Sequence, residues 1–222
     1  MTVQLILAQP IIDLSVELIS SGRRSTITSL PNIVLNDMIN ANLRGSDPQK
    51  NELIEASGII QNSARCVAAC RQRKIPIFWI RVERRADQVD AIAPLTDAFL
   101  AGGRKLHPPV VRDTPEAANV DELPVLPEDQ VILKPRFDPF LGTDLDLQLR
   151  VRKINTILLG GYATNFGVEN CARTARDLGY NVVLLSDCCF NLDRELHEWS
   201  LTRIMPFFAR VMPWEQAFGL LG

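Results

Sequence analysis

The sequence is poor in several features that mark particular classes of protein. Aromatic residues make up 6% of its 222 residues and the formal net charge is -2, so neither a base-stacking surface nor a basic surface for nucleic acid is expected. No apolar run reaches the roughly 20 residues that a membrane-spanning helix needs. The first residues carry no basic segment, and Asp13 and Glu17 interrupt their apolar stretch, so we expect no signal peptide.

Cysteine and histidine are also scarce. An odd number of cysteines without a CxxC pair argues against a disulfide scaffold in a chain of this length; the five are Cys66, Cys70, Cys171, Cys188 and Cys189. The two histidines are far apart in the sequence, His107 in a proline-rich stretch and His197 in a predicted helix. We expect a surface position for His107 and a capping or solvated role for His197. The sequence therefore predicts reduced thiols in a cytoplasmic protein, with no metal and no other cofactor.

The chain does have enough apolar residues, 46% of the total, to bury the core of one α/β domain. Apolar, β-branched runs alternate with amphipathic helical segments from residue 32 onward, and this order predicts a parallel sheet with helices on both faces. We predict a single domain over 32–222, preceded by an arm over 1–31 that packs on the domain or on a neighbouring subunit. The predicted strands are 32–37, 75–82, 130–134, 154–159, 181–187 and 209–212. The predicted helices are 48–73, 90–100, 144–151, 165–178 and 194–208, with a surface excursion over 103–129.

Three of the predicted strands end in residues that suit chemistry. Asp37 ends the first, Lys134 ends the third, and the fourth leads through Gly160 and Gly161 into a helix. In open parallel sheets, ligands bind beyond the carboxyl ends of the strands. A carboxylate moves protons, an ammonium holds an anion, and a helix N-terminus cradles an oxyanion. Each feature also has a structural interpretation: a turn or cap for Asp37, a solvated strand end for Lys134, and close packing of a helix for the glycines.

The sequence around these strand ends resembles the isochorismatase-like, or cysteine hydrolase, superfamily over about residues 32–218. The family segment D-x-Q-N is matched by DMIN from Asp37 to Asn40, with Ile39 at the glutamine position. The segment K-P-R/K-x-x-x-F is matched from Lys134 to Phe140, through Arg136. The block G-V-A-T-N-x-C-V is matched by GYATNFGV over 161–168, and G-Y-x-V-x-x-x-x-D by the residues 179–187.

The resemblance implies a three-layer, Rossmann-like α/β/α domain around a six-stranded parallel sheet, which commonly assembles into dimers or tetramers. It also implies an Asp–Lys–Cys triad, whose first two members map to Asp37 and Lys134. The cysteine maps to Gly167, where no thiol exists. A cis peptide bond is expected between Tyr162 and Ala163, next to the backbone N–H groups of an oxyanion site that includes Gly167.

Cysteines later in the chain are candidates to replace the thiol that is missing at Gly167. Cys171 lies one helical turn beyond Gly167, about 6 Å along the axis, and shares a stripe with apolar residues, so we expect it to pack in the core as an inert hydrophobe. Cys188 and Cys189 follow the fifth strand, and structural roles are expected for both.

A family branch that hydrolyses vinyl ethers does not need the thiol. Protonation of an enol ether gives an oxocarbenium ion that water traps, so an acid is required and a nucleophile is not. We therefore expect a small polar or anionic substrate, with Asp37 as the acid. Two alternatives remain: a catalytically silent member that binds a ligand or partner, and an amidohydrolase that uses Cys171. Candidate substrate-binding residues are Asn40, Arg81, Arg84, Gln88, Arg136, Phe140 and Tyr162.

Overall fold

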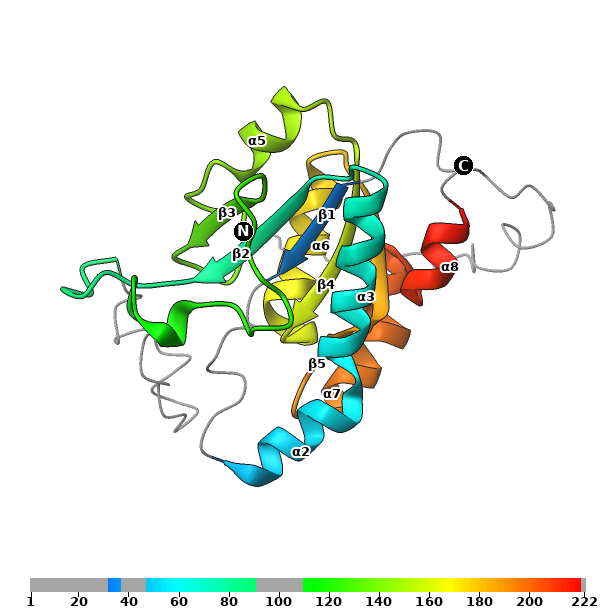
Figure 1. Ribbon diagram of the computed structural model, residues 1–222. Helices are drawn as coiled ribbons and strands as arrows, with labels where there is room; N and C mark the ends of the chain where they lie inside the picture. Colours follow the sequence, from blue (N-terminus) through cyan, green and yellow to red (C-terminus); the bar gives the residue numbers. More distant parts are fainter. Residues whose placement is uncertain (1–31, 37–46, 91–109, 221–222) are drawn as a thin grey trace, which may run out of the picture.

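The computed structural model describes residues 32–36, 47–90 and 110–220 (Figure 1). The N-terminal arm expected over 1–31 lies outside these residues, as does almost all of the helix expected over 90–100. Asp37, Asn40 and His107, which the sequence singled out, also lie outside them.

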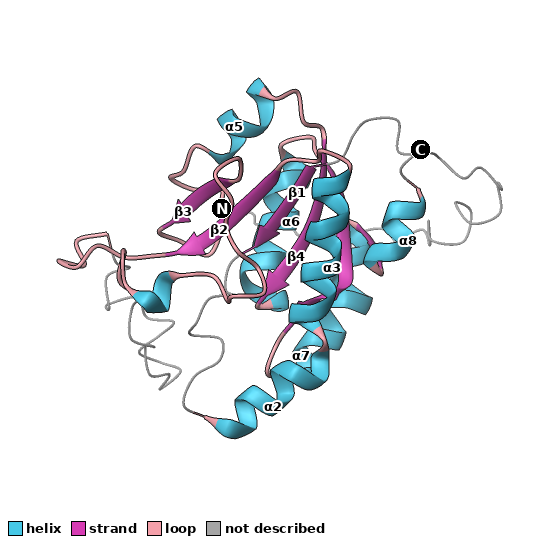
Figure 2. Cartoon of the chain, viewed as in Figure 1, coloured by secondary structure: helices cyan, strands magenta, loops and turns pink. Residues whose placement is uncertain are grey.

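Within the described residues, six strands form one sheet in the order β3-β2-β1-β4-β5-β6, and every neighbouring pair is parallel (Figure 2). The predicted α/β architecture with parallel strands is confirmed. The central strands are continuous apolar runs, as expected of strands covered on both faces. Their bounds are β1 (Asn32–Asn36), β2 (Ile77–Val82), β3 (Gln130–Lys134), β4 (Thr156–Tyr162), β5 (Asn181–Phe190) and β6 (Arg210–Met212).

Two apolar clusters pack on opposite faces of this sheet. Helices α3 (Ile59–Gln72) and α8 (Trp214–Gly219) cover one face, where Trp79 and Leu158 lie in the core. Helices α5 (Leu145–Val151) and α6 (Glu169–Asp177) cover the other, against Phe78 and Leu159. The alternation of side chains along a strand explains why neighbouring residues of β2 and β4 belong to different clusters.

One long predicted helix is in fact two. The expected helix over 48–73 divides into α2 (Pro48–Ser57) and α3 at Gly58, which adopts a left-handed conformation with φ of 68°. Glycine reaches this conformation without the steric penalty that a side chain would add. Leu53, which the apolar pattern assigned to the buried face, is half exposed, whereas Ile60 and Val67 of α3 are buried.

The C-terminal segment also departs from its prediction. The expected helix over 194–208 is limited to α7 (Arg194–Trp199), followed by the π turn η3 (Ser200–Ile204) and the 3₁₀ turn η4 (Met205–Phe207). Pro206 lies in η4, and proline removes a helical hydrogen bond and clashes with the preceding turn. Helix α8 was not predicted. The expected strand over 181–187 continues to Phe190, and the strand expected over 154–159 runs from Thr156 to Tyr162.

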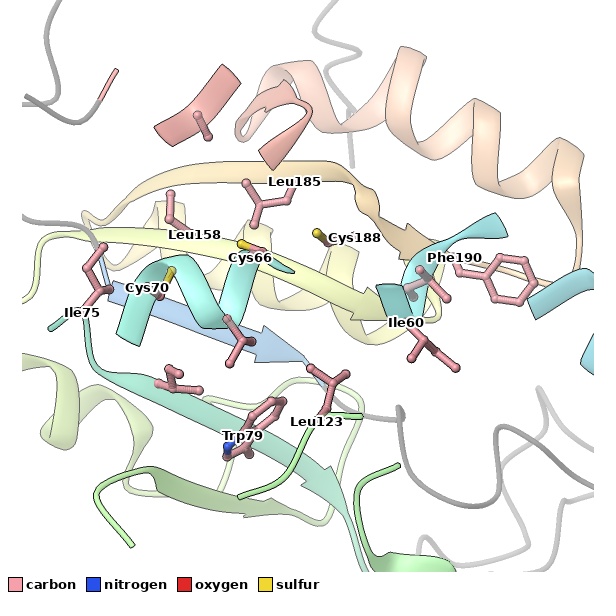
Figure 3. Close-up of a cluster of buried hydrophobic side chains, with 14 of the residues drawn as sticks. Ile60, Cys66, Cys70, Ile75, Trp79, Leu123, Leu158, Leu185, Cys188 and Phe190 are labelled. Carbon is pink, nitrogen blue, oxygen red and sulfur yellow. The ribbon is translucent and has the colours of Figure 1, made fainter. Parts of the chain in front are cut away.

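The described part of the predicted surface excursion, 110–129, contributes to the core. It contains the short 3₁₀ turn η1 (Pro115–Ala117), and its Val120 and Leu123 are buried against the face that carries Trp79 (Figure 3). The Asp129 carboxylate accepts hydrogen bonds from Trp79 Nε1 at 2.8 Å and from Arg71 at 2.7 Å. This segment is therefore attached to the sheet through both apolar and polar contacts. Among the described residues, no helix is long and apolar enough to span a bilayer.

Candidate active site

Lys134 ends β3 in a nearly fully buried position, with 2% of its surface exposed. It follows Ile132 by two residues, so strand alternation directs it to the face that α5 and α6 cover. Its Nζ donates a hydrogen bond to the carbonyl oxygen of Phe137 at 3.0 Å, which holds the following loop over the strand end. A lysine is almost never buried without compensating interactions. The alternative of a solvated strand end is therefore wrong for Lys134.

Strand β4 leads directly into the turn that the resemblance identifies. The peptide bond between Tyr162 and Ala163 is cis, as the resemblance implies. A single π turn, η2 (Thr164–Val168), follows and contains Gly167, which is buried. The Ala163 carbonyl accepts hydrogen bonds from the N–H groups of Phe166 at 3.0 Å and Val168 at 3.4 Å. Turns of this kind occur often at functional sites.

Contacts between the loop after β3 and this turn bring the two parts of the site together. The rings of Phe137 and Phe166 stack with centroids 5.7 Å apart. The Asp138 carboxylate accepts a hydrogen bond from the Thr174 hydroxyl of α6 at 2.5 Å and another from the Phe140 N–H at 2.9 Å. The loop that starts at Lys134 thus lies against η2 and α6. Asp138 was not singled out from the sequence.

The first strand meets this corner through its backbone. The pairing of β1 with β4 places Asn36 opposite Gly161. Asp37 is the next residue in the sequence after Asn36. Its position and that of Asn40 lie outside the described residues. Of the predicted triad, the structure describes only the positions Lys134 and Gly167, and the triad stays a prediction.

Gly160 does not serve the close helix packing that the glycine pair suggested. A Cβ atom built on Gly160 lies 2.8 Å from the Cys188 carbonyl oxygen and 3.0 Å from the Cys188 Cβ. The close approach is therefore to β5, the neighbouring strand, where the register between β4 and β5 shifts between Leu159 and Gly161. A side chain at Gly160 would force the two strands apart.

Each of the five cysteines is free and buried. Cys171 is fully buried in α6, and burial raises the pKa of its thiol to about 12, although Lys134 opposes this. The expectation that Cys171 packs in the core is confirmed. Cys188 and Cys189 are also buried, and Figure 3 shows Cys188 in the core with Cys66 and Cys70. A thiol with so high a pKa carries almost no thiolate, which is the nucleophilic form.

The arginines proposed as substrate ligands already contact the protein. Arg81 Nε lies 2.8 Å from the buried Glu83 carboxylate, and burial raises the pKa of that carboxyl. Arg84 donates to the Pro135 carbonyl, and Arg136 donates to the same carbonyl at 2.8 Å and to Asp90 O at 2.9 Å. These bonds order the loops that border β2 and β3.

The remaining candidates differ in exposure. Gln88 is exposed in a turn and has a φ of 54°. Phe140 is half-buried and stacks on Tyr180, with centroids 6.1 Å apart. Tyr162 is half-buried against Phe190, and burial raises the pKa of its phenol. The expected substrate contacts of these residues stay predictions.

A set of polar contacts behind the turn was not predicted from the sequence. Thr164, which is fully buried, has its Oγ1 atom 2.8 Å from His197 Nδ1. The adjacent Asn165 accepts a hydrogen bond from the buried Asn191 side chain. The expected capping or solvated role for His197 is wrong, because the ring is half-buried and bonded to the turn. No local sequence signal indicates a contact between residues 33 positions apart.

Comparison with known proteins identifies the family of the chain. The isochorismatase domain family matches residues 32–216. The isochorismatase family protein YecD of Escherichia coli O157:H7 is 35% identical over 166 residues, which cover 75% of this chain and 85% of that protein. The ureidoacrylate amidohydrolase RutB of Methylorubrum extorquens strain AM1 is 32% identical over 169 residues, which cover 71% of this chain and 68% of that protein. The solved structure of an isochorismatase family protein from Burkholderia thailandensis matches with a TM-score of 0.73 and 30% identity. The match covers 87% of this chain and 99% of that protein. The chain therefore belongs to the isochorismatase family.

Proposed function

We propose that this protein is a hydrolase that cleaves a vinyl ether in a small anionic substrate without a covalent thiol intermediate. The observation that carries the proposal is the burial of Lys134 at the end of β3, whose following loop packs on the turn η2 through Phe137 and Phe166. The proposal also takes Gly167 of this turn as the position of the family cysteine, as the sequence resemblance implies. Membership of the family supports hydrolysis as the reaction class. The missing thiol favours a reaction that needs a proton donor and a site for the substrate carboxylate but no nucleophilic side chain.

The proposed reaction balances without a cofactor. Asp37, in its protonated form, gives a proton to the β-carbon of the enol ether, which forms a C–H bond and leaves an oxocarbenium ion. Water adds to the cationic carbon and returns a proton to the Asp37 carboxylate. The resulting hemiketal then breaks its C–O bond to give a carbonyl compound and an alcohol. General acid catalysis of this kind requires a carboxyl whose pKa is raised by desolvation.

Lys134 has a separate task in this scheme. Its ammonium binds the carboxylate of the substrate, and this pairing offsets the tendency of a nearby positive charge to keep Asp37 ionised. The backbone N–H groups of the turn that contains Gly167 bind a carboxylate of the substrate, because the reacting carbon itself develops positive charge in this scheme. Phe137 and Phe166 lie exposed at the edge of this turn and offer an apolar surface beside the charged group.

The relatives named as amidohydrolases suggest amide cleavage as a competing reaction. That reaction would require a thiolate if it followed the triad that the family resemblance implies. Cys171 does not suit this task, because it is fully buried and its thiol pKa is about 12. The burial of all five thiols therefore favours the vinyl-ether reaction over a relocated nucleophile.

A catalytically silent, ligand-binding protein is the second candidate function. The absence of a thiol at Gly167 and the isoleucine at position 39 favour it. Such a protein would bind a small anion at Lys134 and release it unchanged. The same experiment separates the two candidates.

The test is a substrate panel with two readouts. Isochorismate releases pyruvate on vinyl-ether hydrolysis, which lactate dehydrogenase reports, and ureidoacrylate releases ammonia on complete amide hydrolysis and decay. We expect pyruvate release by the wild type and none of the ammonia signal. Ammonia without pyruvate would contradict the proposal. Thermal stabilisation by these compounds without turnover of either would support the silent alternative.

Gly167→Cys is the companion variant. A thiol placed at this position lies at the N-terminal turn, where a helix N-terminus lowers a thiol pKa. We expect it to gain ammonia release from ureidoacrylate, because the sequence has Asp37 and Lys134 at the positions that match the other two members of the triad. A variant that folds but gains nothing would show that the turn is not arranged for catalysis.

A further inference from the structure

The segment from 191 to 200 packs against the turn η2 through side-chain hydrogen bonds. Two side-chain contacts join it to the turn, Thr164 to His197 and Asn165 to Asn191, and a third joins Ser200 to Glu169, the first residue of α6. The last of these is a hydrogen bond from the Ser200 hydroxyl to Glu169 Oε2 at 2.8 Å, with both residues at least half-buried. The contacts fall on consecutive parts of the chain, from the start of η2 to the first residue of α6.

Of these contacts, the one made by His197 lies nearest to the cis peptide. Thr164 follows Ala163 directly and is fully buried. A buried hydroxyl proton needs an acceptor, and His197 Nδ1, which lies 2.8 Å from Thr164 Oγ1, can accept this proton when it carries none itself. This pairing requires a neutral imidazole with the proton on Nε2. Burial lowers the pKa of His197, which favours the neutral ring.

We propose that His197 is a positioning residue of the candidate active site, whose unprotonated Nδ1 accepts the Thr164 hydroxyl proton and thereby fixes the turn that carries Gly167. This inference rests on the proposed function only in treating that turn as the place where substrate reacts. The ring does not contact substrate. Its effect passes through Thr164 to the backbone N–H groups of η2.

The charged groups near His197 do not account for its contact with Thr164. The described residues of η2, Thr164–Val168, contain no ionisable side chain. Glu198, the next residue of α7, raises the pKa of His197 and so opposes the neutral form. The other charged residues of α7 and the following η3 are Arg194, Glu195 and Arg203, and Asp193 caps the N-terminus of α7.

Two substitutions of His197 distinguish the effect of the hydrogen bond at Nδ1 from the effect of side-chain size. The Oδ1 atom of asparagine occupies about the place of the histidine Nδ1, so His197→Asn retains an acceptor for Thr164. Glutamine instead places its polar atoms near the position of Nε2, so His197→Gln loses that acceptor. Both variants are neutral and polar, and Glu195→Gln, at an exposed residue of the same helix, is the control.

The experiment is NMR of the full chain, and it needs no substrate. His107→Gln leaves His197 as the only imidazole, and its ¹⁵N signals report the tautomer directly. We expect the Nε2-protonated tautomer, and a rise of roughly half to one unit in the His197 pKa in Thr164→Val, reversed in Thr164→Ser. The Nδ1-protonated tautomer, or an unchanged pKa in Thr164→Val, would overturn the proposal.

The backbone amide signals of the turn give the second measurement. We expect the signals of Thr164, Phe166 and Gly167 to move in His197→Gln and to stay near their wild-type positions in His197→Asn and Glu195→Gln. Equal shifts in the two His197 variants would overturn the proposal. These results do not depend on turnover, so a failed substrate panel with the expected spectra would count against the proposed function alone.

Discussion

Slow alkylation of the native protein by iodoacetamide is the most direct consequence of the buried thiols. The thiol of Cys171 has a pKa of about 12, so at pH 8 about one molecule in 10,000 carries the thiolate. A free cysteine with a pKa of about 8.5 is roughly one-quarter thiolate at the same pH. The lower thiolate population alone slows alkylation of Cys171 roughly 2,000-fold, and complete burial slows it further.

The pH dependence of the rate gives an independent measure. Far below its pKa, a thiol gains about tenfold in thiolate for each pH unit, whereas a free cysteine gains only about threefold between pH 8 and pH 9. We expect the tenfold dependence for Cys171. Peptide mass spectrometry after timed quenching measures the rate at each cysteine, and the same protein in urea supplies the rate for exposed thiols.

A different result would refute this reasoning. If native Cys171 reacts within about tenfold of its rate in urea, or if its rate levels off below pH 9, the thiol is accessible and partly ionised. The amidohydrolase alternative would then recover a nucleophile. The other four cysteines act as internal references, because they are buried as well.

Three further predictions concern stability, each measured by urea unfolding. Gly160→Ala places a Cβ atom 2.8 Å from a backbone carbonyl and should cost about 1–3 kcal/mol; a loss below about 0.5 kcal/mol would contradict the tight strand pairing. Its control, Gly219→Ala, meets nothing within 4 Å and should be neutral or slightly stabilising. Asp129→Ala leaves partly buried donors of Arg71, Trp79 and Leu126 without their acceptor. It should cost about 2–4 kcal/mol, whereas Asp121→Ala, at an exposed residue, should stay within about 0.5 kcal/mol. Since burial lowers the pKa of His197, its contribution to stability is present above the unfolded pKa of about 6.5 and is lost as pH falls through the lower folded pKa. This loss should be absent in His197→Asn, and an identical pH profile in that variant would contradict it.

The main elements were predictable because their signals are local. Continuous apolar runs marked the strands, and the glycine pair after β4 marked the corner. Boundaries within helices were missed although the sequence carried the signals: Gly58 separates α2 from α3, and Pro206 lies where the expected C-terminal helix has given way to short turns. The first predicted helix followed an apolar pattern past Gly58, and the second was extended past Pro206; each of these residues changes the backbone conformation.

The site was predictable only in part. The positions of Lys134 and Gly167 followed from strand ends and motif order, and the inert character of Cys171 followed from its place on an apolar helix stripe. The contact of Thr164 with His197 could not be predicted, because it depends on how the segment after β5 packs behind the turn. The arginine contacts with the Pro135 carbonyl depend on loop conformation in the same way.

The most direct test of a thiol-independent hydrolase is to compare kcat/KM for isochorismate in Asp37→Asn and Cys171→Ala. Asparagine cannot supply the proton, so we expect Asp37→Asn to lose roughly 100-fold or more. Cys171→Ala should retain activity within about threefold once folding is verified. The opposite order, with Cys171→Ala inactive and Asp37→Asn active, would contradict a thiol-independent reaction.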